Sequence, residues 1–301
     1  MNRSLLDRLV RLANSRKNGI SRAPTMLLPP EQYFLYLLAR DYYSAEGDIF
    51  DGGICLGGCT DCFAQGLAAR DDLPERPLVH AYDLAVVTVE SFFKKLGIER
   101  RNGESTLDII EANIAAMPRN ERIVFHHGDI LRQQYPDVIE IMFLDVCKTK
   151  NINFGIQQLF SRLIPEKSVV VHQDYIHPWN PYIHATMGRL EEYFEPVGAV
   201  WFNSMVYLLK KEIPKEALAY HAYEHEPTDV LRKYILLQAR RMNHKAQLTE
   251  LYLACAVMLF DKGEYRACLD LLSMLQSKEC LTGELHAVTT QLCEKINRLH
   301  A

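Results

Sequence analysis

Hydrophobic positions change their spacing twice along the chain. Residues 1–45 show the three- to four-residue spacing of helices, interrupted by prolines, which predicts an N-terminal helical segment. Between residues 46 and 212, short apolar runs of strand length alternate with helical stretches of about ten to fifteen residues. Residues 213–301 return to helical spacing. The pattern therefore predicts an α/β domain with helical additions at both ends.

The middle part predicts a mostly parallel sheet, because strands alternate with helices along most of it. The first five runs lie within GDIFDGGICL, PLVHAYDLA, ERIVFHHGDI, IEIMFLDVCKT and SVVVHQDYIHP. Two further runs share the segment PVGAVWFNSMVYLLKK, which leaves no room for a crossover helix. We therefore expect a closing hairpin that turns at Asn203 and Ser204.

The C-terminal part contains the segment YLACAVMLFDKGEYRACLDLLSML, with a turn near Gly263 and Tyr265. It resembles one tetratricopeptide-type helix pair, but a single repeat cannot bury its own faces. An ordinary helical hairpin packed on the α/β domain is the simpler interpretation.

Composition and charge exclude several classes of partner. Of the 301 residues 48% are apolar, and the net charge of −4 comes from interleaved acidic and basic residues. We expect no nucleic-acid partner, because no basic stripe is present. No apolar run approaches the roughly 20 residues of a membrane helix. The basic, amphipathic opening is a transit peptide or, more simply, a surface helix that packs its leucines inward. Eight dispersed cysteines favour reduced thiols and a cytoplasmic location.

The first strand ends in the glycine-rich turn of GDIFDGGICLGGCT. Such a turn lets the backbone approach a ligand and presents the N-terminus of the next helix to it. A glycine turn without any ligand is the alternative. The residues that we expect to contact a cofactor here are Asp51, Gly52, Gly53, Gly57 and Thr60.

Two acids follow the next two strands. Asp83 ends the second strand, where an acid accepts hydrogen bonds from ribose hydroxyls in nucleotide-binding folds. Asp129 follows the third strand and is placed to neighbour an adenine ring. Each acid alone is also compatible with a helix N-cap. The ordered set of glycine turn, acid and acid favours a nucleotide-type cofactor.

Residues 48–210 resemble a class I S-adenosylmethionine-dependent methyltransferase, whose sheet also ends in a hairpin. Within that class they are most similar to the macrocin O-methyltransferase group, which includes the cephalosporin hydroxylase-like proteins. The similarity lies in GDIFDGGICLGGCTDCFAQGL, in FLDVCKT, and in IQQLFSRLIPEKSVVVHQDY. It implies that the cofactor is S-adenosylmethionine, with Gly53 and Gly57 near its methionine part, Asp83 on the ribose and Asp129 beside the adenine.

The resemblance also implies a site for the acceptor. Asp145 and Asp174 match positions where that group uses carboxylates for a divalent ion and for the acceptor hydroxyl. The chain departs from the group at Cys147 and Gln173, where further acids are usual. Fewer oxygen ligands weaken Mg²⁺ binding, because Mg²⁺ requires several oxygens in octahedral geometry.

The segment QDYIHPWNPYIH is rich in polar and aromatic residues beyond the fifth strand. Ligands of open α/β sheets bind at this carboxyl edge, and a histidine there could deprotonate a hydroxyl. The catalytic candidates are Asp145, Asp174, His172, His177 and Lys148, and His184 and Trp179 are further candidates for the pocket wall. For each single histidine, a surface or hydrogen-bonded core position is the alternative.

Cys55, Cys59 and Cys62 have the C-x3-C-x2-C spacing of iron–sulfur ligands in radical S-adenosylmethionine enzymes. Here the spacing lies within the glycine motif, and Asp61 stands where that family places an aromatic residue. We therefore interpret these cysteines as free thiols, with a cluster or a zinc site as the alternatives.

The leading hypothesis is an S-adenosylmethionine-dependent O-methyltransferase for a small hydroxyl-bearing molecule, such as a sugar or a natural product. A second is a non-catalytic or repurposed methyltransferase fold whose C-terminal helices bind a protein partner or a second copy of the chain. Hydroxylase chemistry is a third, but no 2-His-1-carboxylate spacing supports it.

Overall fold

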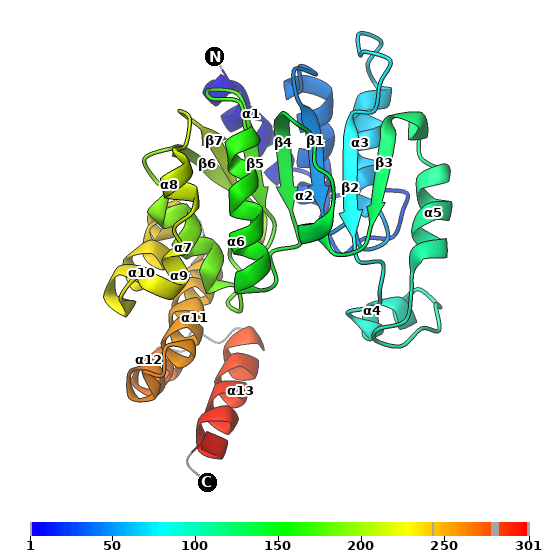
Figure 1. The fold of residues 1–301 in the computed structure, drawn as a ribbon. Coiled ribbons are helices and arrows are strands. Elements are labelled where there is room, and N and C mark those ends of the chain that lie inside the picture. Colours follow the sequence, from blue (N-terminus) through cyan, green and yellow to red (C-terminus); the bar gives the residue numbers. More distant parts are fainter. Residues whose placement is uncertain (1, 243, 278–282, 300–301) are drawn as a thin grey trace.

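The computed structural model describes residues 2–242, 244–277 and 283–299, which fold around one seven-stranded sheet (Figure 1). The strand order is β3-β2-β1-β4-β5-β7-β6. The strands are β1 (Asp48–Gly52), β2 (Val79–Asp83), β3 (Ile123–His127), β4 (Ile139–Leu144), β5 (Val169–His172), β6 (Phe194–Val200) and β7 (Ser204–Leu209). Strands β1 to β5 are parallel, and β7 runs antiparallel to both neighbours. The predicted mostly parallel sheet with its closing hairpin is confirmed.

The predicted hairpin turn was wrong by one residue. Ser204 already belongs to β7 and pairs with Val200, so residues 201–203 make the turn. The backbone pairing of Ser204 with Val200 extends β7 to this residue, and the buried Ser204 hydroxyl also donates to Glu31 in the N-terminal part at 2.6 Å.

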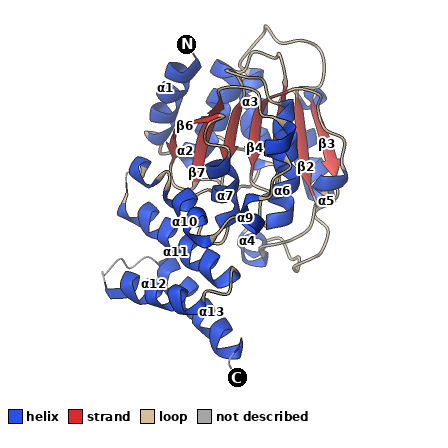
Figure 2. Cartoon of the chain, turned by 60° about the vertical axis from the view of Figure 1, so that its left-hand side comes forward, coloured by secondary structure: helices blue, strands red, loops and turns tan. Residues whose placement is uncertain are grey.

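Helices cover both faces of the sheet (Figure 2). The side chains of the first five helices pack against one face. They are α1 (Asn2–Asn14), α2 (Pro29–Leu37), α3 (Gly58–Ala68), α4 (Glu90–Lys95) and α5 (Leu107–Ala115). A short π-helix (Leu38–Tyr42) continues α2. Strand β4 is buried at all six positions because both of its faces are covered, which explains why its sequence is apolar except at Glu140, whose carboxylate accepts the Ser44 N–H at 2.7 Å and the Glu46 N–H at 3.0 Å.

The opposite face packs against α6 (Lys150–Gln158), α7 (Pro181–Arg189) and the C-terminal part. The regular elements described in that part are all helices, joined by short loops, as predicted. It contains α8 (Lys215–Leu218), α9 (Ala222–His225), α10 (Thr228–Leu236), α11 (Lys245–Asp261), α12 (Tyr265–Ser277) and α13 (Gly283–Leu299). Helices α11 and α12 form the expected pair, and their apolar side chains join the same core as β4, β5 and α7. The pair is therefore a hairpin packed on the α/β domain. No helix among the residues described is long and apolar enough to cross a bilayer.

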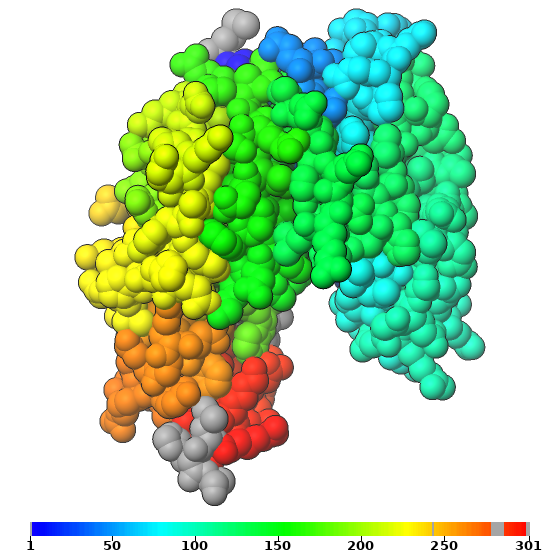
Figure 3. All heavy atoms as spheres, in the orientation of Figure 1, coloured from blue at the N-terminus to red at the C-terminus, as the bar shows by residue number. Residues whose placement is uncertain are grey.

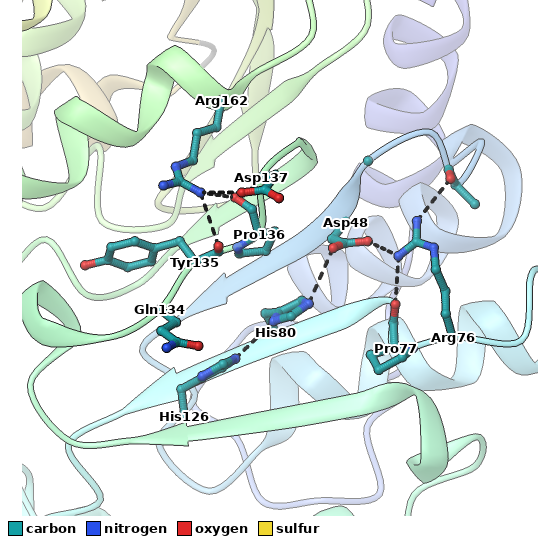
Figure 4. Close-up of polar contacts among 12 residues, drawn as sticks. Asp48, Arg76, Pro77, His80, His126, Gln134, Tyr135, Pro136, Asp137 and Arg162 are labelled. Carbon is teal, nitrogen blue, oxygen red and sulfur yellow. Dashed lines mark hydrogen bonds and ion pairs between the residues drawn. The ribbon is translucent and has the colours of Figure 1, made fainter.

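One part of the sheet lacks a covering helix, because the connection from β3 to β4 contains only the three-residue helix η3 (Ile130–Arg132). Polar side chains occupy the adjoining strand face (Figure 4). His80 Nδ1 and His126 Nε2 lie 3.0 Å apart, and His80 Nε2 lies 3.4 Å from Asp48, which also pairs with Arg76. These polar side chains therefore lie on one face of the sheet and not at the carboxyl edge where the strands end.

The connection between α1 and α2 is tied to the start of α3. The buried Asp61 carboxylate accepts the backbone N–H groups of Arg22 at 2.5 Å and Ala23 at 3.3 Å, and the Ser21 hydroxyl at 3.2 Å. Gly58 leaves the space that Thr25 fills, since an added Cβ would lie 2.3 Å from the Thr25 Cβ. The N-terminal part is thus held against the helix that follows the glycine turn.

We expect Asp61→Ala to lower the free energy of unfolding by about 1–3 kcal/mol, because buried backbone donors lose their acceptor. Urea unfolding measures this. Asp72→Ala is the control, since Asp72 is exposed in a surface ion pair with Arg70 and should change stability by less than about 1 kcal/mol. Equal effects of the two substitutions would contradict the role given to Asp61.

Candidate active site

The site lies where the parallel strands end. Strand β1 has β2 on one side and β4 on the other, and the helices that follow β1 and β4 pack on opposite faces of the sheet. Such a switch point opens a crevice at the carboxyl edge. The edge points downward in Figure 1, between α4 and α13, and Figure 3 shows the surface hollowed on that side.

The glycine turn after β1 is fixed to both neighbouring strands. The Gly53 N–H donates to the Tyr82 carbonyl at 2.9 Å, and the Gly52 carbonyl accepts from the Asp145 N–H at 2.8 Å. Gly53 has a φ of 88°, and a Cβ there would lie 2.7 Å from the Asp145 carbonyl oxygen. Gly57, with a φ of 92°, precedes α3. Both positions therefore require glycine.

Asp83 lies against this turn from the end of β2. Its carboxylate accepts the backbone N–H of Cys55 at 2.8 Å and that of Ala85 at 2.7 Å. Partial burial raises the pKa of Asp83 above its ordinary value, although these N–H donors act in the opposite direction. A carboxylate is thus positioned beside the backbone that would approach a cofactor.

Asp51 and Thr60 lie beneath the turn. Both side chains are buried, and the Thr60 hydroxyl donates to Asp51 at 2.6 Å. Burial raises the pKa of Asp51 to about 7, against the effect of that hydrogen bond. Because both side chains are buried and bonded to each other, they would affect a cofactor only through the shape of the glycine turn.

Asp129 lies beyond the end of β3 and is half exposed. It accepts the Leu131 N–H at 3.0 Å and so caps the short helix η3. This is the capping role that the sequence left open for it. Its contact with an adenine ring stays a prediction.

Asp145 and Asp174, at the ends of β4 and β5, are brought together by one side chain. Lys148 Nζ donates to Asp145 Oδ1 at 2.5 Å and also to Asp174 Oδ2. Burial raises the pKa of Asp145, and the Lys148 charge opposes this effect. Burial lowers the pKa of Lys148, but the two carboxylates outweigh it and raise that pKa above its ordinary value. Three of the predicted catalytic residues therefore form one charged cluster.

The histidines are placed differently. His172 and His184 are buried between β5 and α7 beside two tyrosine rings, and none of their ring nitrogens has a hydrogen-bond partner among the residues described. Burial lowers the pKa of both to about 3, so they are neutral at pH 7. At 1% exposure, His172 cannot touch an acceptor without rearrangement. Its catalytic role stays a prediction that this position does not favour.

The loop after β5 carries the remaining candidates. His177 is partly exposed, and its backbone N–H donates to the Asp174 carbonyl at 3.2 Å. The partly exposed Trp179 ring lies 5.5 Å from Lys295 Nζ of α13. The last helix therefore reaches the side of the edge where we expect the acceptor.

The three cysteines of the glycine motif are free thiols. Cys59 and Cys62 are buried and Cys55 is partly buried, and in each case burial raises the pKa of the thiol. Metal ions and iron–sulfur clusters bind thiolates. Among the residues that the structure describes, no group of three or more His, Cys, Asp or Glu side chains is arranged to hold a metal ion.

Glu31 of α2 is a site residue that the sequence did not reveal. It is 3% exposed and accepts the Ser204 hydroxyl at 2.6 Å and the Leu28 N–H at 3.0 Å. The pKa of Glu31 is raised to about 8, mainly by burial, and the charges of Asp145 and Asp174 act in the same direction. In the sequence it follows two prolines, where an acid reads as an ordinary helix-capping residue.

No known family model matches the chain, and no curated protein sequence matches it. Among solved structures it is similar to the O-methyltransferase NovP, with a TM-score of 0.45 and 14% identity over 70% of this chain and 100% of that one. It is also similar to the SAH-bound methyltransferase PaMTH1 of Podospora anserina, with a TM-score of 0.36 and 14% identity over 69% of this chain and 88% of that one. Likenesses this distant carry no conclusion about chemistry, which has to be inferred from the residues of the site.

The close approach at Gly53 leads to a matched test. Gly53→Ala and Gly103→Ala both place an alanine at a φ near +87°, but nothing lies within 4 Å of a Cβ at Gly103. We expect Gly103→Ala to cost about 1–2 kcal/mol of stability for the left-handed backbone. Gly53→Ala should cost clearly more, because its Cβ meets the β4 backbone. Urea unfolding compares the two, and equal losses would mean that the contact with Asp145 is unimportant.

Glu31 leads to a pH prediction. Its pKa is raised from 4.5 to about 8 in the folded chain, so the native state holds a proton that the unfolded state releases between these values. The contribution of Glu31 to stability should therefore fall as the pH rises from about 4.5 to 8. Glu31→Gln keeps a neutral group that can donate to Ser204, and it should flatten the decline in melting temperature over this range.

Thermal unfolding at pH 5, 6, 7 and 8 measures the effect. Glu99→Gln, at an exposed position, serves as the control and should keep the wild-type slope. If Glu31→Gln also keeps that slope, the carboxyl group is ionised in the folded protein throughout, contrary to the prediction.

Proposed function

We propose that the protein is an S-adenosylmethionine-dependent O-methyltransferase for a small hydroxyl-bearing molecule such as a sugar or a natural product. One observation carries the proposal. The glycine turn with Asp83 and the pair Asp145 and Asp174 occupy the same carboxyl edge, on either side of the switch point between β1 and β4. A cofactor on the first group would face an acceptor on the second.

The cofactor would be held by backbone and by one acid. The turn around Gly53 and Gly57 offers a backbone without side chains in the way, and Asp83 keeps lone pairs free to accept hydrogen bonds from ribose hydroxyls. When bound, S-adenosylmethionine supplies the methyl group of its sulfonium centre to the acceptor oxygen. The fixed position of the turn against β2 and β4 supports the alignment on which such a displacement depends.

The acceptor would be oriented by the cluster around Lys148. Asp145 follows β4 directly, and its backbone lies against Gly53, so its carboxylate is the one that we assign as the base for the hydroxyl proton. Asp174 and the Lys148 ammonium would orient the acceptor oxygen. Trp179 and His177 on the loop after β5 would form the wall of the pocket.

The alternative of a non-catalytic binding protein gains no support from the C-terminal helices. Helices α11 and α12 direct their apolar side chains into the common core. A protein partner or a second copy of the chain on their outer surface stays a prediction.

Isothermal titration calorimetry with S-adenosylmethionine and S-adenosylhomocysteine tests the proposal. We expect both to bind, and Asp83→Asn to weaken binding by about 1–3 kcal/mol through lost ribose hydrogen bonds. Asn at this position can still accept one N–H bond of the turn, so the fold should persist, which circular dichroism checks. Asp137→Asn is the control, because Asp137 is fully exposed. Absence of binding to the folded wild type would refute the proposal.

A further inference from the structure

Lys148 lies between the two carboxylates that the family resemblance assigned to a divalent ion. Its Nζ donates to Asp145 Oδ1 at 2.5 Å and to Asp174 Oδ2, and Asn180 Nδ2 approaches that second oxygen at 3.4 Å. The gap between the carboxylates is therefore already filled by a positive charge that belongs to the chain.

The residues around this gap do not fit Mg²⁺. That ion requires near-octahedral coordination, and within a protein it relies on oxygen ligands. Here the two acids have the buried thiol of Cys147 and the amide of Gln173 at positions where further carboxylates would strengthen a metal site. The approach of the Asn180 amide N–H groups to Asp174 also opposes a cation, because that oxygen already accepts hydrogen bonds.

The turn that follows β4 holds Lys148 in place. The Lys148 N–H donates to the Val146 carbonyl at 2.7 Å, and the next residue, Thr149, caps α6 by accepting the Ile152 N–H at 3.2 Å. Lys148 and Asp145 are three residues apart in the same short connection. The local backbone geometry therefore positions the Lys148 ammonium next to the carboxylates. A divalent ion would have to displace it and then lie beside a second positive charge.

We propose that the Lys148 ammonium takes the place of a divalent metal ion at this site, which makes the site independent of metal. The inference builds on the proposed function and narrows its substrate class. Without a metal, an acceptor is oriented by hydrogen bonds to Asp145, Asp174 and Lys148. It therefore needs one hydroxyl group and not the pair of neighbouring oxygens that chelation of a metal uses.

A titration with Mn²⁺ tests this without any methyl-transfer assay. Binding is measured as the loss of the free-ion signal in electron paramagnetic resonance. The double variant Asp145→Asn/Asp174→Asn is the control, because it reports only Mn²⁺ that binds elsewhere on the surface. The wild type and Lys148→Arg, which keeps the positive charge, should bind no more Mn²⁺ than this control. Lys148→Met removes the ammonium with little change in length. This variant should bind one Mn²⁺ more than the wild type does. Adding Asp174→Asn to it should abolish the binding of that additional ion.

The wild-type titration alone can overturn the proposal. If the wild type binds one Mn²⁺ more than the doubly substituted control, the ion displaces Lys148 and the proposal fails, even if Lys148→Met does not fold. If Lys148→Met folds, as judged by circular dichroism, and gains no Mn²⁺, the carboxylate pair is not a cation position and the proposal also fails. Neither result bears on cofactor binding, which calorimetry tests separately.

Discussion

The pairing of β1 with β4 is the constraint on which the site depends. It sets Gly52 opposite Leu144, so the chain leaving β1 passes directly against the backbone of Asp145. Only a residue without a Cβ fits there, and the turn can then bring backbone close to a ligand. The same pairing places Asp145 beside that turn. The proposed cofactor and acceptor sites are thereby joined through one contact between two strands.

Charge is the second organising feature of this edge. Burial raises the pKa of the carboxyl groups of Glu31, Asp51, Asp83 and Asp145, so each is costly to ionise in the folded chain. The protein meets this cost by different means at each position. Asp83 accepts backbone N–H groups, Asp51 accepts a hydroxyl, and Asp145 shares Lys148 with Asp174. A cluster of acids near a shared cation is suited to moving a proton from an acceptor hydroxyl.

The helical additions complete the edge from both sides. The N-terminal part is anchored at Asp61 and brings Glu31 to Ser204 of the closing hairpin. At the other end of the chain, Lys295 of α13 reaches the Trp179 ring in the loop after β5. The sheet therefore carries the proposed cofactor site, whereas the helical additions at both ends of the chain lie beside the proposed acceptor site.

The sequence by itself determined the sheet, its closing hairpin, the glycine turn and the order of the acids at the strand ends. These features follow from local periodicity and from the rule that parallel strands end at one edge. Tertiary structure alone decided which side chains meet. Glu31 and Ser204 are 173 residues apart, yet the Ser204 hydroxyl donates to the Glu31 carboxylate. His172 and Asp174 are two residues apart in the sequence, yet only the packing of α7 on the sheet shows that one is buried and the other contacts Lys148. Such contacts depend on how distant elements pack, which no local pattern records.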